Sequence, residues 1–514
     1  MRHDEVAKRP NILLITSDQH RGDSFGFENP GIYTPHLDRL ARDGTRFSAC
    51  ITPNPVCQPA RASILTGLLP RTHGVCDNGI DLPPEVGDRG FAGQLGRAGY
   101  TTAMIGKAHF NTMHTYAPTG TPECKVSSAE YGPHWRGPYM GFQHVELVTE
   151  GHNIWLPSKP PQGQHYEAWY HGDGLGEEKN ALYREARAPL TDAVQTWNSA
   201  LPVAWHNSTW VGDRTVRFLE DQADTEEPFC VWASFPDPHH PFDAPEPWCR
   251  LHDPAAVRLP EHRTLDLDRR PWWHAASHNR PPGPGAKEIL GNFLQYPPQT
   301  DAQLRAIIAN YYGMISLIDH NVGRILTALH ASGKANDTYV IFTADHGEWL
   351  GDHGLLFKGP IPYEGLLRVG MIVRGPGVPA GKVVGEPVST LDLVPTFLDW
   401  AGREPEALLH GASLRPLIET EDARREFALC EWDLGPSRIG VPLRLRTVRT
   451  RRHKLTIEAE SGAGELYDLE ADPDEMDNRF DDPAYAAIRA DLMAMLARRP
   501  DDARAERLPQ AGMA

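Results

Sequence analysis

The chain has 514 residues, 40% of them hydrophobic and 23% charged, which predicts a globular protein with a large core and one or two domains. A formal net charge of −17 argues against nucleic acid and anionic membrane as partners, but a locally cationic site could still bind an anionic substrate. No stretch approaches the roughly 18 apolar residues that a membrane span needs.

The first residues and the cysteines indicate a compartment. Residues 1–9 are polar and mixed in charge, without the apolar segment of a signal peptide. The seven cysteines are scattered and odd in number, which fits a reducing environment better than a disulfide framework. We therefore expect a cytoplasmic protein.

Short apolar runs that predict buried strands alternate with helical patterns along most of the chain. The runs are residues 11–16, 229–235 and 339–343, and the helical patterns are 34–41 and 311–329. This alternation predicts an α/β fold with a large mixed, mainly parallel sheet covered by helices on both faces. Sheets of this kind place ligands at the carboxyl ends of their strands.

Two stretches, 124–209 and 260–300, are irregular and rich in Trp, His, Gly and Pro. Long loops of this kind usually cover or shape a pocket, so we expect these two to do so. The alternative interpretation is a pair of insertions without function.

The pattern changes after residue 417. Short strands are predicted at 427–431, 444–450, 453–457 and 465–469, followed by a helix at about 485–498. We expect a catalytic domain at 1–420 and a C-terminal α+β subdomain at 421–514, with a small antiparallel sheet and a terminal helix.

Two polar pairs follow predicted strands directly, Asp18-Gln19 and Asp345-His346. Together they offer two carboxylates, an amide oxygen and an imidazole, a set that suits one divalent cation. A single Asp-His pair is more often a cap or a salt bridge, but two pairs in the same strand-end context favour a metal site.

Cationic and proton-carrying residues occur at further separated positions. Lys107 and His109 follow the strand-like run 100–105, and side-chain alternation would point both in the same direction. Each of these residues alone is usually a solvated or structural group. Gathered in one pocket, they would form a cradle for a tetrahedral oxyanion. The full set is Arg61, Lys107, His109, His239 and Lys358.

Residues 57–61 read Cys-Gln-Pro-Ala-Arg and precede a small-apolar run that starts a helix. Alone, the segment could be a buried structural cysteine beside a turn proline. With the other ordered motifs, the chain resembles the type I, formylglycine-dependent sulfatase family of the alkaline phosphatase superfamily over nearly its whole length. The matching segments are 10–13, 34–40, 57–61, 97–102, 106–109, 238–241, 343–347, 392–396, 410–414, 466–469 and 472–473.

The resemblance implies an alkaline phosphatase-like fold and an arylsulfatase-like hydrolysis of small-molecule sulfate monoesters. It implies that a formylglycine-generating enzyme oxidises Cys57 to formylglycine, whose hydrate is the nucleophile, and that Arg61 orients that hydrate. The implied metal ligands are Asp18, Gln19, Asp345, His346 and the group derived from Cys57.

The resemblance also implies the roles of the remaining candidates. Lys107 and His109 would hold the hydrate and promote release of the oxyanion. His239 and Lys358 would stabilise or protonate the leaving group, and both would contact the substrate, as would Lys107. Asn78 matches a position that often touches the bound oxyanion.

Two departures from the common pattern bear on the branch of the family. Gln19 and His346 resemble the choline-sulfatase and phosphonate monoester hydrolase branches, and they weaken the case for Ca²⁺ and strengthen that for Mn²⁺. Phosphonate monoester hydrolases generally lack the pair formed by Lys107 and His109, so we expect sulfate as the main substrate and phosphate or phosphonate esters as side substrates.

Two alternatives stay open from the sequence. One is a phosphonate monoester or phosphodiester hydrolase on the same fold, and the other is a non-catalytic binding relative. The resemblance favours a homo-oligomer, a dimer or a tetramer.

Overall fold

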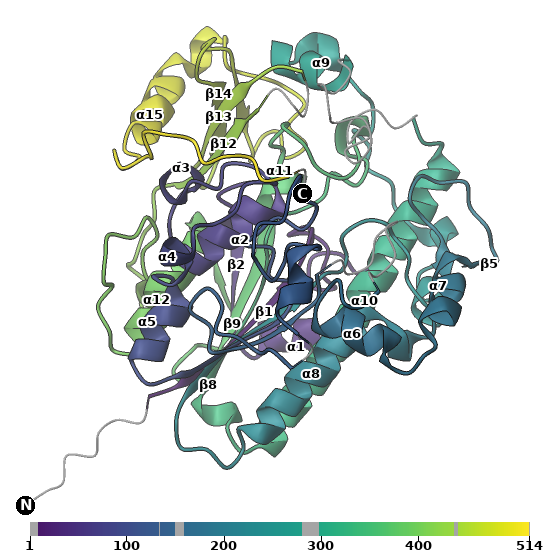
Figure 1. Ribbon diagram of the computed structural model, residues 1–514. Coiled ribbons are helices and arrows are strands. Elements are labelled where there is room, and N and C mark those ends of the chain that lie inside the picture. The colour runs from purple at the N-terminus through teal and green to yellow at the C-terminus, as the bar shows by residue number, and fades with distance from the viewer. Residues whose placement is uncertain (1–8, 133, 150–158, 280–297, 436–439, 513–514) are drawn as a thin grey trace, which may run out of the picture.

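The computed structural model describes residues 9–132, 134–149, 159–279, 298–435 and 440–512 (Figure 1). Its larger sheet has nine strands, in the order β10-β2-β9-β8-β1-β7-β3-β4, with β11 beside β2. The strands are β1 (Asn11–Ser17), β2 (Thr45–Ile51), β3 (Thr101–Gly106), β4 (His144–Leu147), β7 (Phe229–Phe235), β8 (Thr338–Ala344), β9 (Arg368–Arg374), β10 (Lys382–Val384) and β11 (Val388–Ser389).

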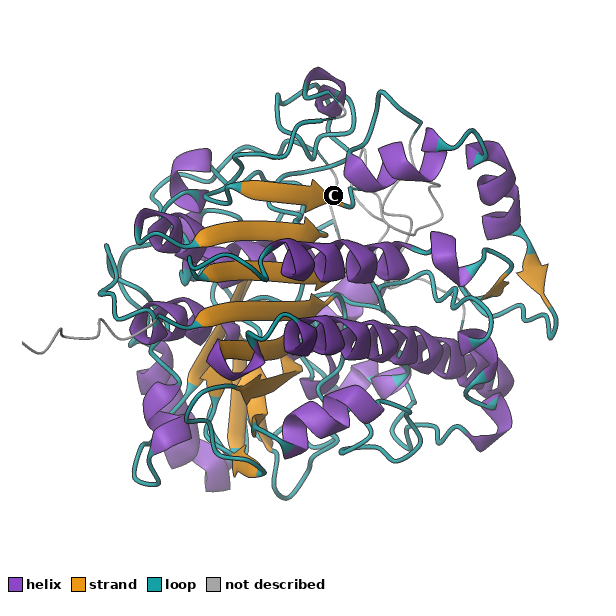
Figure 2. Cartoon of the chain, turned by 90° about the horizontal axis from the view of Figure 1, so that it is seen from below, coloured by secondary structure: helices purple, strands orange, loops and turns teal. Residues whose placement is uncertain are grey.

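The sheet is mixed and mainly parallel, as the sequence predicts. Strand β1 lies between β7 and β8 and is parallel to both, whereas β9 is antiparallel to β8 and to β2. All seven residues of β1 are buried, because a central parallel strand is covered on both faces and needs no polar side. In Figure 2, strands of this sheet point in one direction with helices lying along them.

Helices cover both faces of the sheet. Alternate residues of β1 belong to two separate cores, Ile12 and Leu14 to one and Leu13 and Ile15 to the other. The first core includes helices α2 (Cys57–Thr66), α5 (Phe91–Arg97) and α12 (Leu393–Trp400), and the second includes α1 (Pro35–Arg42), α8 (Asn207–Asp221) and α10 (Asp301–Ala331).

A smaller antiparallel sheet, in the order β12-β13-β14-β15, follows near the C-terminus. Its strands are β12 (Ala428–Leu434), β13 (Leu443–Arg449), β14 (His453–Glu458) and β15 (Gly464–Asp468), and α15 (Ala486–Leu496) packs against β13 and β14. The predicted C-terminal sheet and helix are therefore confirmed. The boundary after residue 420 stays a prediction.

The two stretches predicted to be irregular contain more regular structure than expected. They include the short elements α6 (His165–Gly172), α7 (Gly176–Arg184), β5 (Ala186–Arg187), β6 (Asn198–Ser199) and α9 (Trp272–Asn279). Some of their aromatic residues are buried, as Tyr166 of α6 is against Trp210 of α8, whereas Trp169 and Trp272 are exposed. Residues 150–158 and 280–297 lie outside the described residues.

The remaining short helices are α3 (Pro70–His73), α4 (Pro84–Gly87), α11 (Glu364–Leu367) and α13 (Arg415–Glu419). Within the described residues, none of the helices is both long and apolar enough to cross a membrane. All seven cysteines are buried and free.

Candidate active site

Cys57 is the first residue of α2, at the edge where the parallel strands end. Val56 before it is extended, and all ten residues of α2 are buried. Gln58 fixes this start, because its side chain accepts a hydrogen bond from the Gly79 amide (2.8 Å) and donates one to the Ile80 carbonyl (2.7 Å). The amino end of a helix stabilises negative charge, which favours an ionised group at position 57.

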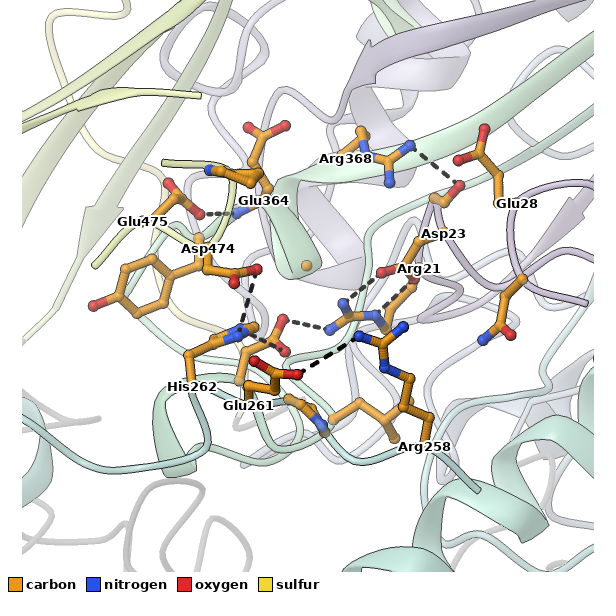
Figure 3. A pocket seen from close by; sticks show the side chains of 18 of the residues that line it. Arg21, Asp23, Glu28, Arg258, Glu261, His262, Glu364, Arg368, Asp474 and Glu475 are labelled. Carbon is orange, nitrogen blue, oxygen red and sulfur yellow. Dashed lines mark hydrogen bonds and ion pairs between the residues drawn. The ribbon is translucent and has the colours of Figure 1, made fainter. Parts of the chain in front are cut away.

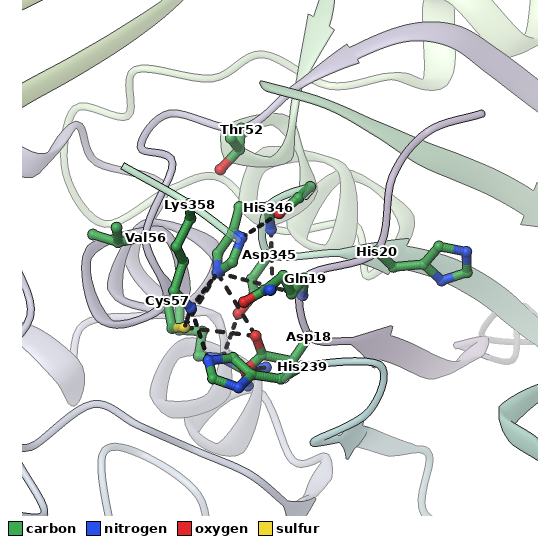
Figure 4. A network of polar contacts seen from close by, with 12 residues as sticks. Asp18, Gln19, His20, Thr52, Val56, Cys57, His239, Asp345, His346 and Lys358 are labelled. Carbon is green, nitrogen blue, oxygen red and sulfur yellow. Dashed lines mark hydrogen bonds and ion pairs between the residues drawn. The ribbon is translucent and has the colours of Figure 1, made fainter. Parts of the chain in front are cut away.

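The Cys57 sulfur lies among cationic and metal-ligating side chains (Figure 4). Lys358 Nζ is 2.8 Å from Sγ, His346 Nε2 is 3.2 Å away and Asp18 Oδ1 is 3.5 Å away. Burial alone raises the pKa of the thiol, but Lys358, Lys107 and His346 outweigh it and bring the pKa well below its usual value. The pocket is therefore built to hold an anion at position 57.

Arg61 lies one turn after Cys57 on the same face of α2. Its guanidinium is fully buried and donates to Asp345 Oδ2 (2.8 Å), Asp18 Oδ2 (3.3 Å), the Lys107 carbonyl (2.6 Å) and Ser234 Oγ (2.8 Å). These contacts join α2 to the ends of several strands. Arg61 thus holds the two candidate metal-binding carboxylates in place.

Asp18 and Asp345 face each other across neighbouring strand ends. Together with Cys57 and His346, they place four possible ligand atoms within 4.8 Å of one another. Burial raises the pKa of Asp345, and the nearby Asp18 raises it further. The pKa of Asp18 is lowered despite burial, because Lys107, His239 and Arg61 stabilise its charge.

Gln19 adds an unused acceptor to this group. Its Nε2 contacts His240 Nδ1 (3.0 Å) and donates to Glu348 Oε2, whereas its buried Oε1 has no hydrogen-bond partner. An orphaned buried oxygen is costly unless a cation or water contacts it. Carboxylates, an imidazole and this oxygen together fit a divalent cation of the hard or borderline kind.

Lys107 and His109 both reach the nucleophile position, but not by side-chain alternation. Strand β3 ends at Gly106, and His109 has a φ of 53°, so the segment turns instead of continuing extended. Lys107 Nζ is 2.5 Å from Asp18 Oδ2, and Cys57 is among the groups that act on the pKa of the His109 imidazole. Burial lowers the pKa of His109 to about 4, which favours the neutral imidazole.

The other candidates also lie around Cys57. His239 Nε2 is 2.9 Å from Lys358 Nζ, and burial together with this lysine lowers the pKa of His239 to about 4. Asn78 Oδ1 accepts a hydrogen bond from the Gln58 amide (3.0 Å), in the first turn of α2. The structure therefore brings every sequence-predicted site residue into one cluster.

Two buried carboxylates were missed by the sequence analysis. Glu123 accepts hydrogen bonds from the backbone amides of residues 109–111 and from the Tyr139 hydroxyl (2.6 Å). Glu348 contacts Gln19 and the segment that carries Lys358. Glu348 is an acidic residue only two positions after the predicted ligand His346, and this proximity in the sequence was a usable signal. No sequence pattern marks Glu123.

A cavity of about 780 Å³ is lined by none of the candidate site residues (Figure 3). Its charged side chains neutralise one another. Arg21 pairs with Asp23 (2.6 Å) and Asp352 (2.7 Å), and Arg449 pairs with Glu364 (3.2 Å). These contacts indicate a structural ion-pair network, so the chemistry belongs to the Cys57 cluster.

Comparison with known proteins agrees with this site. Residues 10–403 match the family model "Sulfatase", and residues 351–502 match "N-sulphoglucosamine sulphohydrolase, C-terminal". The chain is 31% identical to an arylsulfatase of Clostridium perfringens over 93% of this chain and 91% of that one. It is 28% identical to a choline-sulfatase of Rhizobium meliloti, with 95% and 85% covered. A phosphonate monoester hydrolase from Silicibacter pomeroyi superimposes with a TM-score of 0.78 at 25% identity, covering 97% of both chains.

Proposed function

Since the chain belongs to the sulfatase family and is a sulfuric ester hydrolase, we propose that it cleaves sulfate monoesters with a formylglycine made from Cys57. The observation that carries the proposal is the surroundings of the Cys57 sulfur, where Lys358, His346 and Asp18 lie within 3.5 Å. A thiol with no chemical role would not need so many charged neighbours in a buried site.

The side chains would divide the reaction between them. Asp18, Gln19, Asp345 and His346 would hold a divalent cation, which with the hydrated aldehyde supplies an activated oxygen nucleophile at neutral pH. Arg61 would keep both carboxylates ionised and oriented, because its guanidinium contacts each of them.

Substrate binding and proton movement would fall to the loop residues. Lys107 and Lys358 would neutralise the sulfuryl oxygens, and Asn78 would contact them. His239, which contacts Lys358, would face the ester oxygen and stabilise the departing alcohol or phenol. His109, which burial keeps neutral and which lies close enough to Cys57 for the two to affect each other's pKa, would take the proton whose removal expels the sulfate.

A second candidate function is hydrolysis of phosphonate or phosphate esters at the same site. The likeness to phosphonate monoester hydrolases supports it, and the same cations fit any tetrahedral oxyanion. Lys107 and His109, both at the nucleophile, support sulfate as the main substrate. Maturation by a formylglycine-generating enzyme, a preference for Mn²⁺ over Ca²⁺, a homo-oligomer and a cytoplasmic location stay predictions.

One experiment tests the nucleophile and the ranking of substrates together. After co-expression with a formylglycine-generating enzyme, the intact mass should fall by about 18 Da at Cys57, as expected for exchange of the thiol for an aldehyde. kcat/KM is then measured for matched aryl sulfate and aryl phosphonate esters, with C57A as the control. An unmodified, inactive protein would contradict the proposal, and a large preference for phosphonate would favour the second candidate.

A further inference from the structure

Glu348 is a fully buried carboxylate two residues after His346. Its Oε1 accepts hydrogen bonds from the backbone amides of Leu350 (3.0 Å) and Phe357. These two donors prevent the carboxylate from rotating, so its other oxygen, Oε2, stays directed at Gln19 Nε2. The pair is a contact between two side chains that are both inaccessible to solvent.

The backbone of Glu348 is fixed independently of Gln19. Its amide donates to the Gly365 carbonyl (3.0 Å), and its carbonyl accepts from Arg21 Nη1 (2.9 Å). Arg21 Nη1 also donates to the next carbonyl, that of Trp349 (2.8 Å). Glu348 is therefore a rigid acceptor whose position does not depend on a bound cation.

Gln19 uses both protons of its amide nitrogen. One goes to Glu348, and the other goes to His240 Nδ1 at 3.0 Å, which must accept because an amide nitrogen only donates. The backbone of Gln19 is held as well, by Asp345 Oδ1 (3.0 Å) and the Tyr311 hydroxyl (2.7 Å). With the nitrogen committed on one side, Oε1 is left without a protein partner.

We propose that Glu348 is a positioning residue that orients the Gln19 amide so that its oxygen, not its nitrogen, faces the cation. The inference rests on the metal site of the proposed function. A carbonyl oxygen can bind a divalent cation, whereas an amide nitrogen bearing two protons cannot. Glu348 thus decides whether the chain offers a full set of ligands.

The variant E348Q keeps the size and shape of side chain 348 but should reverse the orientation of the Gln19 amide. Its side-chain oxygen would remain on the two backbone amides, so the new NH₂ group would face Gln19. Two NH₂ groups cannot bond to each other, and Gln19 would turn its oxygen toward position 348 and its nitrogen toward the cation. Loss of such an outer hydrogen bond typically lowers metal affinity by about 10–100-fold.

The experiment titrates the chelator-treated full chain with Mn²⁺ and, separately, with Ca²⁺ by calorimetry, so that the readout is affinity and not turnover. We expect E348Q to lower the affinity about 10–100-fold. The matched control is D319N, which removes a buried carboxylate on α10 whose hydrogen bonds come from the backbone amides of His36 (3.2 Å) and Leu37 (2.8 Å) rather than from Gln19 or Arg21. D319N should leave the affinity unchanged.

A double-mutant cycle with Q19A tests whether Glu348 acts through Gln19. In the Q19A background, E348Q should cause no further loss, because the oxygen it orients is absent. Unchanged affinity in E348Q, an equal loss in D319N, or additive losses would overturn the inference. If E348Q does not fold, E348D, which withdraws the carboxylate from Gln19 by one methylene, replaces it with the same expectation. Failure of the unmutated chain to bind either cation would overturn the metal site together with the inference.

Discussion

The two halves of the site are built differently. On the metal side, Asp18 and Asp345 come directly after Ser17 and Ala344, which are paired in register on neighbouring parallel strands, so the sheet itself sets their spacing, although Gln19 beside Asp18 is left-handed at φ 63°. On the substrate side, His109 and Lys358 sit in turns that contain left-handed residues, His109 at φ 53° and Phe357 at φ 65°. Such turns need support from elsewhere in the protein.

Buried carboxylates supply that support. Glu123 holds the backbone amides around His109, and Glu348 holds both the amide that precedes Lys358 and the side chain of Gln19 on the metal side. Changes on the metal side should therefore lower stability and activity together. Changes on the substrate side should lower activity with little effect on stability.

The largest effect is expected for D345N. The variant removes a proposed metal ligand and leaves the buried Arg61 without one of its two carboxylates. We expect kcat/KM for an aryl sulfate to fall by at least about 10³-fold, and the free energy of unfolding by roughly 3 kcal/mol. Urea unfolding and steady-state kinetics measure the two effects. If kcat/KM fell while the free energy of unfolding stayed unchanged, the metal side would behave like the substrate side, and the contrast between the two halves would be wrong.

The variant H109A tests the substrate side. Loss of a proton acceptor at the nucleophile should lower kcat by about 10²–10⁴-fold. The free energy of unfolding should change by only about 1 kcal/mol, because His109 is half-buried and Glu123 still holds the turn. Metal affinity should match that of the unmutated chain. A fall in that affinity would mean that His109 also supports the metal side.

The carboxylate under the His109 turn predicts a pH-dependent stability. Burial raises the pKa of Glu123 to about 7 from the ordinary 4.5, despite its hydrogen bonds to Tyr139 and to residues 109–111. The folded state therefore binds more protons than the unfolded state between these values. The contribution of Glu123 is fully present below pH 4.5 and is lost as the pH rises through 7, by about 3 kcal/mol in total.

The variant E123Q cannot titrate at this position and isolates the effect. Urea unfolding at about pH 5 and pH 8 should show a smaller loss of stability in E123Q than in the unmutated chain. Other buried acids titrate in both proteins, so the difference between the two in their loss of stability reports on Glu123. If the free energy of unfolding changed equally with pH in both proteins, Glu123 would not titrate in this range.

The smallest effect is expected for N78A. Asn78 Oδ1 accepts the Gln58 amide in the first turn of α2, where Val56 provides no side-chain cap. Loss of a cap of this kind costs about 1 kcal/mol, which thermal unfolding would detect. A rise in KM for sulfate esters would, in addition, support the predicted contact between Asn78 and the oxyanion of the substrate. An unchanged melting temperature would show that α2 does not need this acceptor.

The metal side could be predicted from the sequence because its signals are local. An apolar run of residues 11–16 ends in Asp18, another at 339–343 ends in Asp345, and parallel strands bring such ends together. The substrate side was only partly predictable. Lys107 and His109 were recognised, but the alternation invoked for them was wrong, because β3 ends at Gly106 and a turn follows.

The supporting carboxylates could not be predicted for a related reason. Glu123 accepts from backbone amides that come within reach of one carboxylate only once the turn at 109–111 has formed, and no periodicity in the sequence marks that turn. Glu348 likewise depends on the amide of Phe357, nine residues away along an irregular loop. Loops of this kind are determined by tertiary contacts rather than by local propensity.

The burial of α2 bears on when Cys57 could be modified relative to folding. Cys57 is 1% exposed, and the helix that it begins has no accessible residue. If Cys57 is oxidised to formylglycine as proposed, the modifying enzyme must therefore reach the sulfur before α2 packs against the sheet, and a chain that folded first would keep its thiol.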